Sequence, residues 1–473
     1  MGPLLLLFLQ ASAYQSGVQA YGEHRYADAI PFLEKAAEGG SQALAARYML
    51  GNACLQVHLD AKAGQNFAAL FQVAPDSAPE YLLTAAMMLR LQMTPGAAAE
   101  AGHALELDPH IPQAHYILGE IALARGDYGK AVAELQKEIE ANPGFFMAYF
   151  QLGDADERRG AWEDAISALE RSIWLNPNHS GPYALIGKAY LKHGDRDDAE
   201  GALRHALQMD PQDQSIRQLL ATLTPPPASP QPPPPSPELI GRKEYLAGHI
   251  QAAIPWMEKA RAGGDRNNEL FFVLGNSYLQ TQQVPKGRAA FAELYGVTPE
   301  SGAARLVTAH MLIRLELEDQ AQTELEAALA REPKLPEAHY MLGEIAIYRA
   351  QIDRAVTELN REIELNPGYA MAYYRLGDAY TRREDWEHAV PPLQRAVWLD
   401  PTYSGPYILL GKTYLKQGDL PEAERMLRRA LRLDPKNASA HYLLGRTLIQ
   451  SGHAEEGKKL LQRWEELKKS SDF

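Results

Sequence analysis

The chain has 473 residues, of which 46% are apolar and 23% charged, as is typical of folded proteins rather than disordered ones. Residues 1–224 hold 16 Lys and Arg against 27 Asp and Glu, a net charge of -11, and residues 225–473 hold 31 against 33, a net charge of -2. Because neither half is basic, a phosphate backbone has no electrostatic counterpart, and we expect no nucleic-acid partner. The single Cys54 excludes an intramolecular disulfide and a cysteine-based metal site.

The N-terminus carries a short apolar segment, MGPLLLLFLQASA. Apolar residues from Leu4 to Leu9 precede the small residues Ala11–Ala13, a pattern typical of a signal-peptide cleavage site. The segment is shorter than the roughly 20 apolar residues that span a bilayer, so we expect no membrane span. It also lacks Lys or Arg before its apolar residues, and in the alternative interpretation the leucines begin the first helix. We predict a signal peptide at 1–13 and an exported protein, periplasmic or secreted; without that peptide the protein is cytoplasmic.

Small residues and prolines recur every 34 residues along most of the chain, for example Pro75, Pro109, Pro143, Pro177 and Pro211. Within one such unit, residues 112–144, apolar residues recur at helical spacing in two segments that flank a turn near Gly126. Gly119 allows the two helices to approach closely. These patterns predict two amphipathic helices per unit and an all-α protein.

The repeated residues resemble the tetratricopeptide repeat (TPR) family, whose units combine an aromatic residue, Leu-Gly, a second aromatic or small residue, Ala, a bulky apolar residue, Ala and Pro. In the unit that begins at Ser180, where we expect Ser180 to cap the first helix, the matching residues are Tyr183, Ile186, Gly187, Tyr190, Ala199, Leu203, Ala206 and Pro211. Units begin near residues 10, 44, 78, 112, 146 and 180, and again near 234, 268, 302, 336, 370, 404 and 438; those at 78 and 302 match least well. The resemblance implies an α-solenoid of helix–turn–helix units in two tandem right-handed superhelical arrays.

The second set of units copies the first at an offset of 224 residues: AIPFLEKA at 29–36 reappears as AIPWMEKA at 253–260. We predict array 1 at 14–223, with about six units and a capping helix, and array 2 at 238–473, with about seven units of which the last is a cap. Between them, TPPPASPQPPPPSP at 224–237 has nine prolines in fourteen residues and is predicted to be a semi-rigid polyproline linker. The alternative for this linker is a docking motif for a proline-binding module.

No catalytic, phosphate-binding or metal-binding motif occurs in the sequence. His115 and His339 stand at packing positions of their repeats, where a packed histidine is a better interpretation than a metal ligand. Carboxylate pairs such as Glu138 and Glu140 lie two residues apart on a helix and so do not face each other. We predict no enzymatic activity, no catalytic residue, no cofactor and no metal.

The family resemblance implies that the first helix of each unit lines a concave groove, with its fifth, ninth, twelfth and thirteenth positions facing inward. The predicted peptide-binding groove residues are Tyr48, Asn52, Tyr116, Glu120, Phe150, Asp154, Arg158, Lys188 and Lys192 in array 1, and Phe272, Asn276, Tyr340, Glu344, Tyr374, Asp378, Arg382, Lys412, Lys416, Tyr442 and Arg446 in array 2. Aromatic anchors beside charged residues suit an extended peptide or a helix. The alternative is that duplication copied these residues with the rest and that they form internal ion pairs, such as Asp154 with Lys188.

We therefore predict a non-enzymatic scaffold that binds protein or peptide partners in the grooves of two duplicated arrays. The clamp that some family members use for a C-terminal carboxylate is missing, because Tyr48 and Ala86 replace residues of that clamp. The alternative function is a homo-oligomeric, self-associating structural or assembly protein of the cell envelope.

Overall fold

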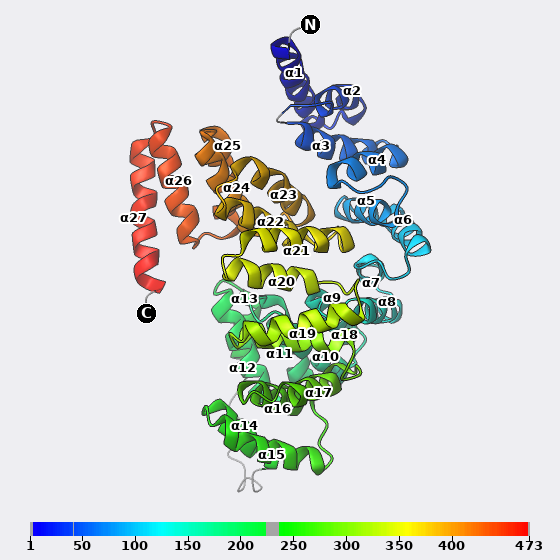
Figure 1. Ribbon diagram of the computed structural model, residues 1–473, viewed down its shortest axis with the longest axis vertical. Coiled ribbons are helices and arrows are strands. Elements are labelled where there is room, and N and C mark those ends of the chain that lie inside the picture. Colours follow the sequence, from blue (N-terminus) through cyan, green and yellow to red (C-terminus); the bar gives the residue numbers. More distant parts are fainter. Residues whose placement is uncertain (1–2, 41, 224–235, 472–473) are drawn as a thin grey trace. The chain divides into compact units, whose positions relative to one another are not determined.

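The structure, a computed structural model, describes residues 3–40, 42–223 and 236–471. Within these ranges the chain forms twenty-seven helices, α1 to α27, and no strand (Figure 1). The predicted all-α class is confirmed. The predicted proline-rich linker lies outside the described residues except for its last two, Ser236 and Pro237.

Every predicted unit folds as two consecutive helices. In the first copy the pairs are α1 (Pro3–Gly22) and α2 (Tyr26–Ala37), α3 (Ala43–Gln56) and α4 (Asp60–Phe71), α5 (Ala78–Arg90) and α6 (Thr94–Leu107), α7 (Ala114–Ala124) and α8 (Tyr128–Ala141), α9 (Phe146–Arg158) and α10 (Trp162–Leu175), and α11 (Ser180–His193) and α12 (Arg196–Met209). Helix α13 (Gln214–Ala221) follows them, and its role as a cap stays a prediction.

In the second copy the pairs are α14 (Pro237–Leu246) and α15 (Ile250–Ala262), α16 (Asn268–Gln280) and α17 (Val284–Tyr295), α18 (Gly302–Arg314) and α19 (Glu318–Arg331), α20 (Ala338–Tyr348) and α21 (Ile352–Leu365), α22 (Ala370–Arg382) and α23 (Trp386–Leu399), α24 (Ser404–Gln417) and α25 (Leu420–Leu433), and α26 (Ala438–Gln450) and α27 (Ala454–Ser471). Helices of a pair pack against each other, as α26 and α27 do in Figure 1. The helix–turn–helix units are thus confirmed, including the two with the weakest sequence match.

The pair α7 and α8 shows why these residues fold this way. Gly126 has a φ of 76°, a left-handed conformation that glycine adopts at no steric cost, and this ends the first helix. The Asp127 carboxylate then accepts a hydrogen bond from the Lys130 backbone N–H (3.2 Å) and caps the second helix. A Cβ atom added to Gly119 would lie 2.7 Å from Leu135 Cγ, so the close approach predicted for this glycine is confirmed.

The described helices gather in two compact units, and each unit takes helices from both sequence copies. Unit 1 holds the described residues up to Ile111 and from His339 onward, whereas unit 2 runs from Pro112 to Ala338 apart from the gap at 224–235. Each unit therefore combines the front of one copy with the back of the other. The predicted boundaries at 14–223 and 238–473 describe the sequence duplication and stay predictions, as does the arrangement in two tandem right-handed arrays.

An aromatic stack joins the two copies inside each unit. In unit 1, Trp398 of α23 stacks on Tyr48 of α3, with ring centroids 5.0 Å apart and ring planes 10° apart. In unit 2, Trp174 of α10 stacks on Phe272 of α16, with centroids 4.5 Å and planes 9° apart. Trp174 and Phe272 stand at the positions equivalent to Trp398 and Tyr48 at the offset of 224, so the two units are joined by the same contact.

A buried arginine makes the second contact of this kind. Arg395 of α23 donates from Nε to the Leu70 carbonyl oxygen (2.8 Å), and its equivalent Arg171 of α10 donates to the Leu294 carbonyl oxygen (3.0 Å). Arg395 is only 7% exposed, and burial lowers the pKa of its guanidinium. A bond to a helix-end carbonyl provides a partner for a charge that is costly to bury.

A third equivalent contact lies beside each arginine. Tyr373 meets Phe71 edge to face in unit 1, and Tyr149 meets Tyr295 edge to face in unit 2, each pair with centroids 6.0 Å apart. Three matched contacts therefore hold the front of one copy to the back of the other in each unit, between residues at least 98 positions apart in the sequence.

Candidate functional site: a face of first helices

The first helices of neighbouring units lie side by side and form a continuous face. In unit 1, α22 contacts α24 and α24 contacts α26; in unit 2, α7 contacts α9 and α9 contacts α11. The predicted groove positions fall on these helices and on α3, α16 and α20. Unit 1 holds Tyr48, Asn52, Tyr340, Glu344, Tyr374, Asp378, Arg382, Lys412, Lys416, Tyr442 and Arg446, and unit 2 holds Tyr116, Glu120, Phe150, Asp154, Arg158, Lys188, Lys192, Phe272 and Asn276.

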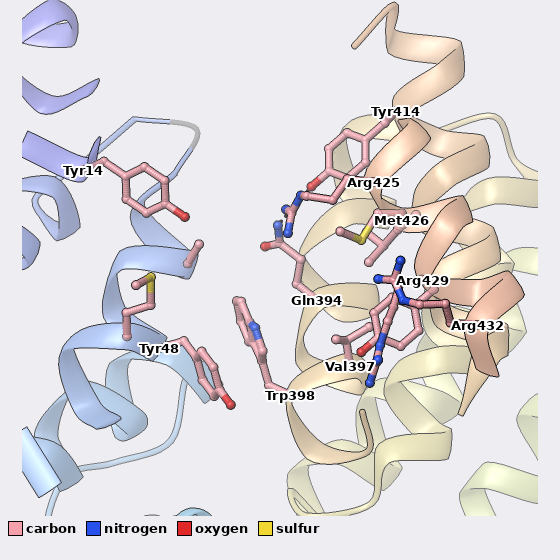
Figure 2. Close-up of a pocket in the computed structure, with 14 residues that line it drawn as sticks. Tyr14, Tyr48, Gln394, Val397, Trp398, Tyr414, Arg425, Met426, Arg429 and Arg432 are labelled. Carbon is pink, nitrogen blue, oxygen red and sulfur yellow. Dashed lines mark hydrogen bonds between the residues drawn. The ribbon is translucent and has the colours of Figure 1, made fainter. Parts of the chain in front are cut away.

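The predicted positions at the front of each copy are already covered. Tyr48 lies against Trp398, as Figure 2 shows, and Phe272 lies against Trp174. Asn52 and Asn276 are each only 4% exposed. The front of each predicted groove is therefore filled by side chains of the other copy in the same unit.

Aromatic positions farther along pack on the loops between units. Tyr116 meets Phe145 and Tyr340 meets Tyr369, each edge to face, with centroids 5.2 and 5.1 Å apart. The remaining aromatic positions also have ring partners: Phe150 with His179, Tyr374 with Tyr403 and Tyr442 with Trp464. These rings pack against other rings of the chain, so the charged positions are the ones that distinguish one part of the face from another.

The acidic positions have partners on the same face. Glu120 accepts hydrogen bonds from the Tyr116 hydroxyl (2.8 Å) and Gln151 Nε2 (3.2 Å), and burial raises the pKa of Glu120. The other ion pairs are Asp154 with Arg158 (3.0 Å), Glu344 with Arg375 (2.8 Å) and Asp378 with Arg382 (3.1 Å). Internal pairing thus occurs, but Asp154 pairs with Arg158 rather than with Lys188.

Three basic positions at the back of the second copy, Lys412, Lys416 and Arg446, have no carboxylate partner among the described residues. Lys412 and Lys416 of α24 lie 5.9 and 5.8 Å from the ring centroid of Trp386. Arg446 of α26 lies over Tyr442 at 5.7 Å and donates a hydrogen bond to its hydroxyl (3.4 Å). Lys416 and Arg446 are exposed. We call Lys412, Lys416 and Arg446 the cationic strip.

The equivalent positions of the first copy are also basic. Lys188 and the exposed Lys192 of α11 form no ion pair within the described part of the chain. The hydrogen bond from the Ser215 hydroxyl is the main cause that lowers the pKa of Asp213, and the charge of Lys188 contributes. Lys188 is therefore close enough to α13 for its charge to act there.

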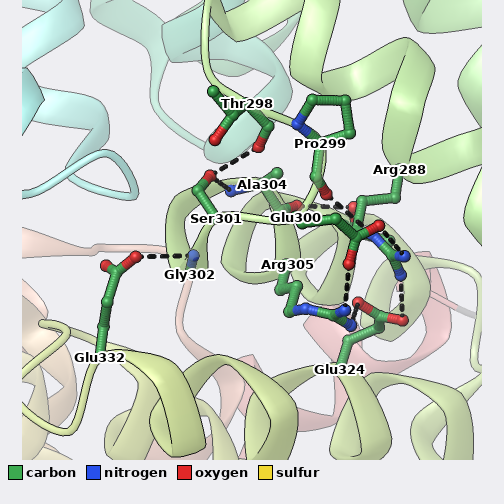
Figure 3. A network of polar contacts seen from close by, with 11 residues as sticks. Arg288, Thr298, Pro299, Glu300, Ser301, Gly302, Ala304, Arg305, Glu324 and Glu332 are labelled. Atoms are coloured by element: carbon green, nitrogen blue, oxygen red, sulfur yellow. Dashed lines mark hydrogen bonds and ion pairs between the residues drawn. The ribbon is translucent and has the colours of Figure 1, made fainter.

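A partly buried ion network in unit 2 binds helices together. Arg288 of α17 donates to Glu324 of α19 (2.7 Å) and to Glu300 (2.8 Å), while Arg305 of α18 donates to the same two carboxylates (Figure 3). Arg288 also donates to the Pro299 carbonyl oxygen (2.9 Å). Each carboxylate is held between two arginines, which suits a structural tie between three helices rather than a general acid or base.

The described residues show no cluster of His, Cys, Asp and Glu side chains arranged to hold a metal ion. His115 contacts Glu134 (2.7 Å) and His339 contacts Glu358 (2.8 Å) in matching pairs. Among the helices described, none is long and apolar enough to cross a bilayer.

Sequence reasoning missed the tryptophans that cover the groove positions. Trp174 and Trp398 lie at the ends of second helices, where no groove residue was expected. The signal was present in the sequence: SIWLNP at 172–177 recurs as AVWLDP at 396–401, and both copies keep a large ring beside the unit boundary.

Comparison with known proteins assigns the repeat. Two family models, each described as a tetratricopeptide repeat, match residues 158–223 and 414–471, and residues 89–145, 122–180 and 340–404. No curated protein matches the chain.

Several solved structures resemble the chain. MamA from Desulfovibrio magneticus RS-1 is 24% identical, with 36% of this chain and 97% of that chain covered and a TM-score of 0.34. YrrB, described as a TPR protein with an unusual peptide-binding site, is 21% identical, with 38% and 93% covered and a TM-score of 0.34. The Cut9–Hcn1 hetero-tetramer of APC/C is 16% identical, with 97% and 94% covered and a TM-score of 0.37. Because the family models together match more than half of the residues, this chain belongs to the tetratricopeptide repeat family.

Proposed function

We propose that the protein is a non-enzymatic scaffold that binds protein or peptide partners on its face of first helices. The observation that carries this proposal is the cationic strip of α24 and α26, whose three basic side chains lie on aromatic rings and have no carboxylate partner among the described residues. Elsewhere on the face, arginines are paired with acidic residues. The strip therefore has unused binding capacity for a partner.

The chemistry of the strip favours an acidic partner segment with apolar or aromatic residues. Lysine and arginine next to exposed ring faces can pair with carboxylates, while the rings provide apolar contact area at a low entropy cost. Three consecutive first helices, α22, α24 and α26, offer a path along which an extended peptide or a helix can lie.

Charge reversal tests this proposal. Acidic peptides selected from a displayed library on the full chain should bind K412E/K416E/R446E at least about tenfold more weakly, because each lost charge-assisted contact costs about 1.5–3 kcal/mol. Affinity is measured by fluorescence anisotropy, and circular dichroism checks that helicity is unchanged.

The matched control is K35E/K436E/K459E, which makes the same change in net charge at exposed residues that lie off the first helices. This control should retain affinity. Equal losses in both triple variants would mean that only net charge matters, and the strip would then not be the binding site.

Self-association remains the second candidate function, and the matched contacts between the two copies favour it. Each unit pairs the front of one copy with the back of the other, and the same pairing between two chains would produce an exchanged dimer.

Export rests on the N-terminal segment. Residues 3–13 lie in α1, which continues to Gly22, and N-terminal sequencing of the natural protein tests whether residues 1–13 are removed.

A further inference from the structure

Unit 1 contains a cavity of about 400 Å³ where the two copies meet. One side is lined from α1 and α3 and the other from α23, α24 and α25, as Figure 2 shows. Five aromatic rings line it: Tyr14, Tyr48, Trp398, Tyr407 and Tyr414. The volume falls within the roughly 300–1,000 Å³ of small-molecule sites, and the rings offer flat apolar walls.

The charged side chains of this cavity are all cationic. Arg425, Arg429 and Arg432 line it, and no acidic residue does. Arg425 pairs with Glu422 outside the lining, whereas Arg429 lies over the Tyr407 ring at 5.9 Å and, in the part of the chain that the structure describes, donates only from Nη2, to the Pro401 carbonyl oxygen (3.5 Å). Within the described residues Arg432 has no hydrogen-bond or ion-pair partner, and its side chain is exposed. At least two guanidinium groups are therefore available to an anion.

Unit 2 contains the duplicate of this cavity, about 490 Å³ in volume, with the same aromatic frame. Trp174, Phe272, Tyr183 and Tyr190 occupy the positions equivalent to Trp398, Tyr48, Tyr407 and Tyr414. The walls of the two cavities are therefore built from equivalent residues of the two sequence copies.

The charge of the duplicate is reversed. Gly201, His205 and Gln208 stand at the positions equivalent to the three arginines. Four carboxylates line the duplicate cavity, from Glu170, Asp197, Asp198 and Glu269, against the single Arg242, which pairs with Glu269 (2.8 Å). Two cavities built on one frame thus differ in the sign of their charge.

We propose that the unit 1 cavity binds a small aromatic anion and that its duplicate in unit 2 excludes it. The ring of the ligand lies against the aromatic walls, and its anionic group accepts charge-assisted hydrogen bonds from Arg429 and Arg432. This site is distinct from the cationic strip, because its arginines lie on the second helix α25, whereas the strip lies on the first helices α24 and α26. Carboxylates at the duplicate repel the same ligand.

Isothermal titration of the full chain with naphthalene-2-carboxylate tests the proposal. One molecule is expected to bind per chain, with affinity that falls as salt rises. The neutral naphthalene-2-carboxamide and the cationic naphthalen-2-ylmethylammonium should bind the unit 1 site at least about tenfold more weakly, because they lack a charge for the arginines. Equal binding of the carboxamide, or no binding of the carboxylate, would overturn the proposal.

Variants place the site. R429Q/R432Q should weaken carboxylate binding at least about tenfold, whereas H205Q, at the equivalent position of unit 2, should leave it unchanged. Arg432 is exposed, so R432Q should leave the fold unchanged. A loss of affinity in this variant would therefore report on ligand binding and not on folding. Retention of affinity in R432Q and in R429Q/R432Q, or an equal loss in H205Q, would contradict the assignment.

Discussion

At the scale of the residue, a glycine in most first helices sets how closely the helices of a pair can pack. A Cβ atom added to Gly187 of α11 would lie 2.6 Å from Leu203 Cγ, a distance that real structures avoid. Gly201 of α12, in the same pair, has no neighbouring heavy atom within 4 Å of such a Cβ. The two glycines therefore have opposite roles in one helix pair.

We expect Gly187→Ala to destabilise the pair by about 1–3 kcal/mol, because the added methyl group overpacks the contact with Leu203. Gly201→Ala should stabilise it by about 0.5–1 kcal/mol, because alanine loses less backbone freedom in a helix. Hydrogen exchange of α11 and α12 measures both changes. Equal protection in the two variants would refute the packing role of Gly187.

The residue scale also shows how far sequence reasoning reaches. The packing roles of Gly119 and Gly187 followed from the repeat pattern, because neighbours within one unit are fixed by its spacing. The expected cap at Ser180 is wrong: α11 begins with Ser180, and His179 stands at the cap position without a side-chain cap bond. A cap depends on one residue's backbone geometry, which the 34-residue period does not specify.

At the scale of the element, a buried carboxylate ties together the two helices of α7/α8 and of its duplicate α20/α21. Glu138 of α8 accepts hydrogen bonds from the backbone N–H groups of Gln113 (2.7 Å) and Tyr116 (3.2 Å) at the start of α7. Glu362 repeats this contact with the Tyr340 N–H in the second copy. Burial raises the pKa of Glu138 to about 7, more than these hydrogen bonds lower it.

This raised pKa predicts a pH-dependent stability of the unit. The folded pKa of about 7 exceeds the ordinary value of 4.5, so the folded chain keeps a proton that the unfolded chain releases. The stabilisation that the protonated Glu138 gives to the folded chain is complete below about pH 4.5 and is lost as the pH rises through about 7. The free energy of unfolding, measured with urea, should therefore fall between pH 5 and pH 8 by roughly 1–3 kcal/mol more in the wild type than in E138Q.

E140Q, at an exposed neighbour on the same helix, is the control and should follow the wild type. If E138Q and the wild type change in parallel with pH, Glu138 does not carry the effect.

Contacts between helices of different copies could not be predicted from the sequence. The helix pairs followed from periodicity, because each unit contacts its sequence neighbours. The stacks of Trp398 on Tyr48 and of Trp174 on Phe272 join segments from different copies, and a local period carries no information on such pairs. The predicted groove positions lie on first helices and stay predictions, and the cover of Tyr48 and Phe272 by tryptophans of the other copy was not foreseen.

At the scale of the whole molecule, both units depend on both sequence copies. Fragments 14–223 and 238–473, produced separately and mixed, should therefore associate, because the matched contacts can re-form between them. Light scattering of the mixture measures the complex. Replacing both stacked tryptophans, W174A/W398A, should weaken association at least about tenfold, because aromatic anchors dominate such contacts.

W386A is the control, because Trp386 lies beside Lys412 and Lys416 and takes no part in the matched contacts. Fragments that stay monomeric in the mixture at micromolar concentrations would contradict the joint composition of the units. Self-association of either fragment alone would instead favour the assembly function.

The reciprocity of the matched contacts has a consequence for the history of the chain. In a two-fold homodimer, residue i of one subunit contacts residue j of the other, and residue j of the first contacts residue i of the second. Two copies of an unduplicated ancestor would make the matched contacts in this way. In a homodimer both cavities must carry the same residues. Joining the two subunits in one chain removes that constraint, so one cavity could acquire Arg425, Arg429 and Arg432 while the other acquired carboxylates. A fused chain can therefore carry two chemically different sites on matched walls.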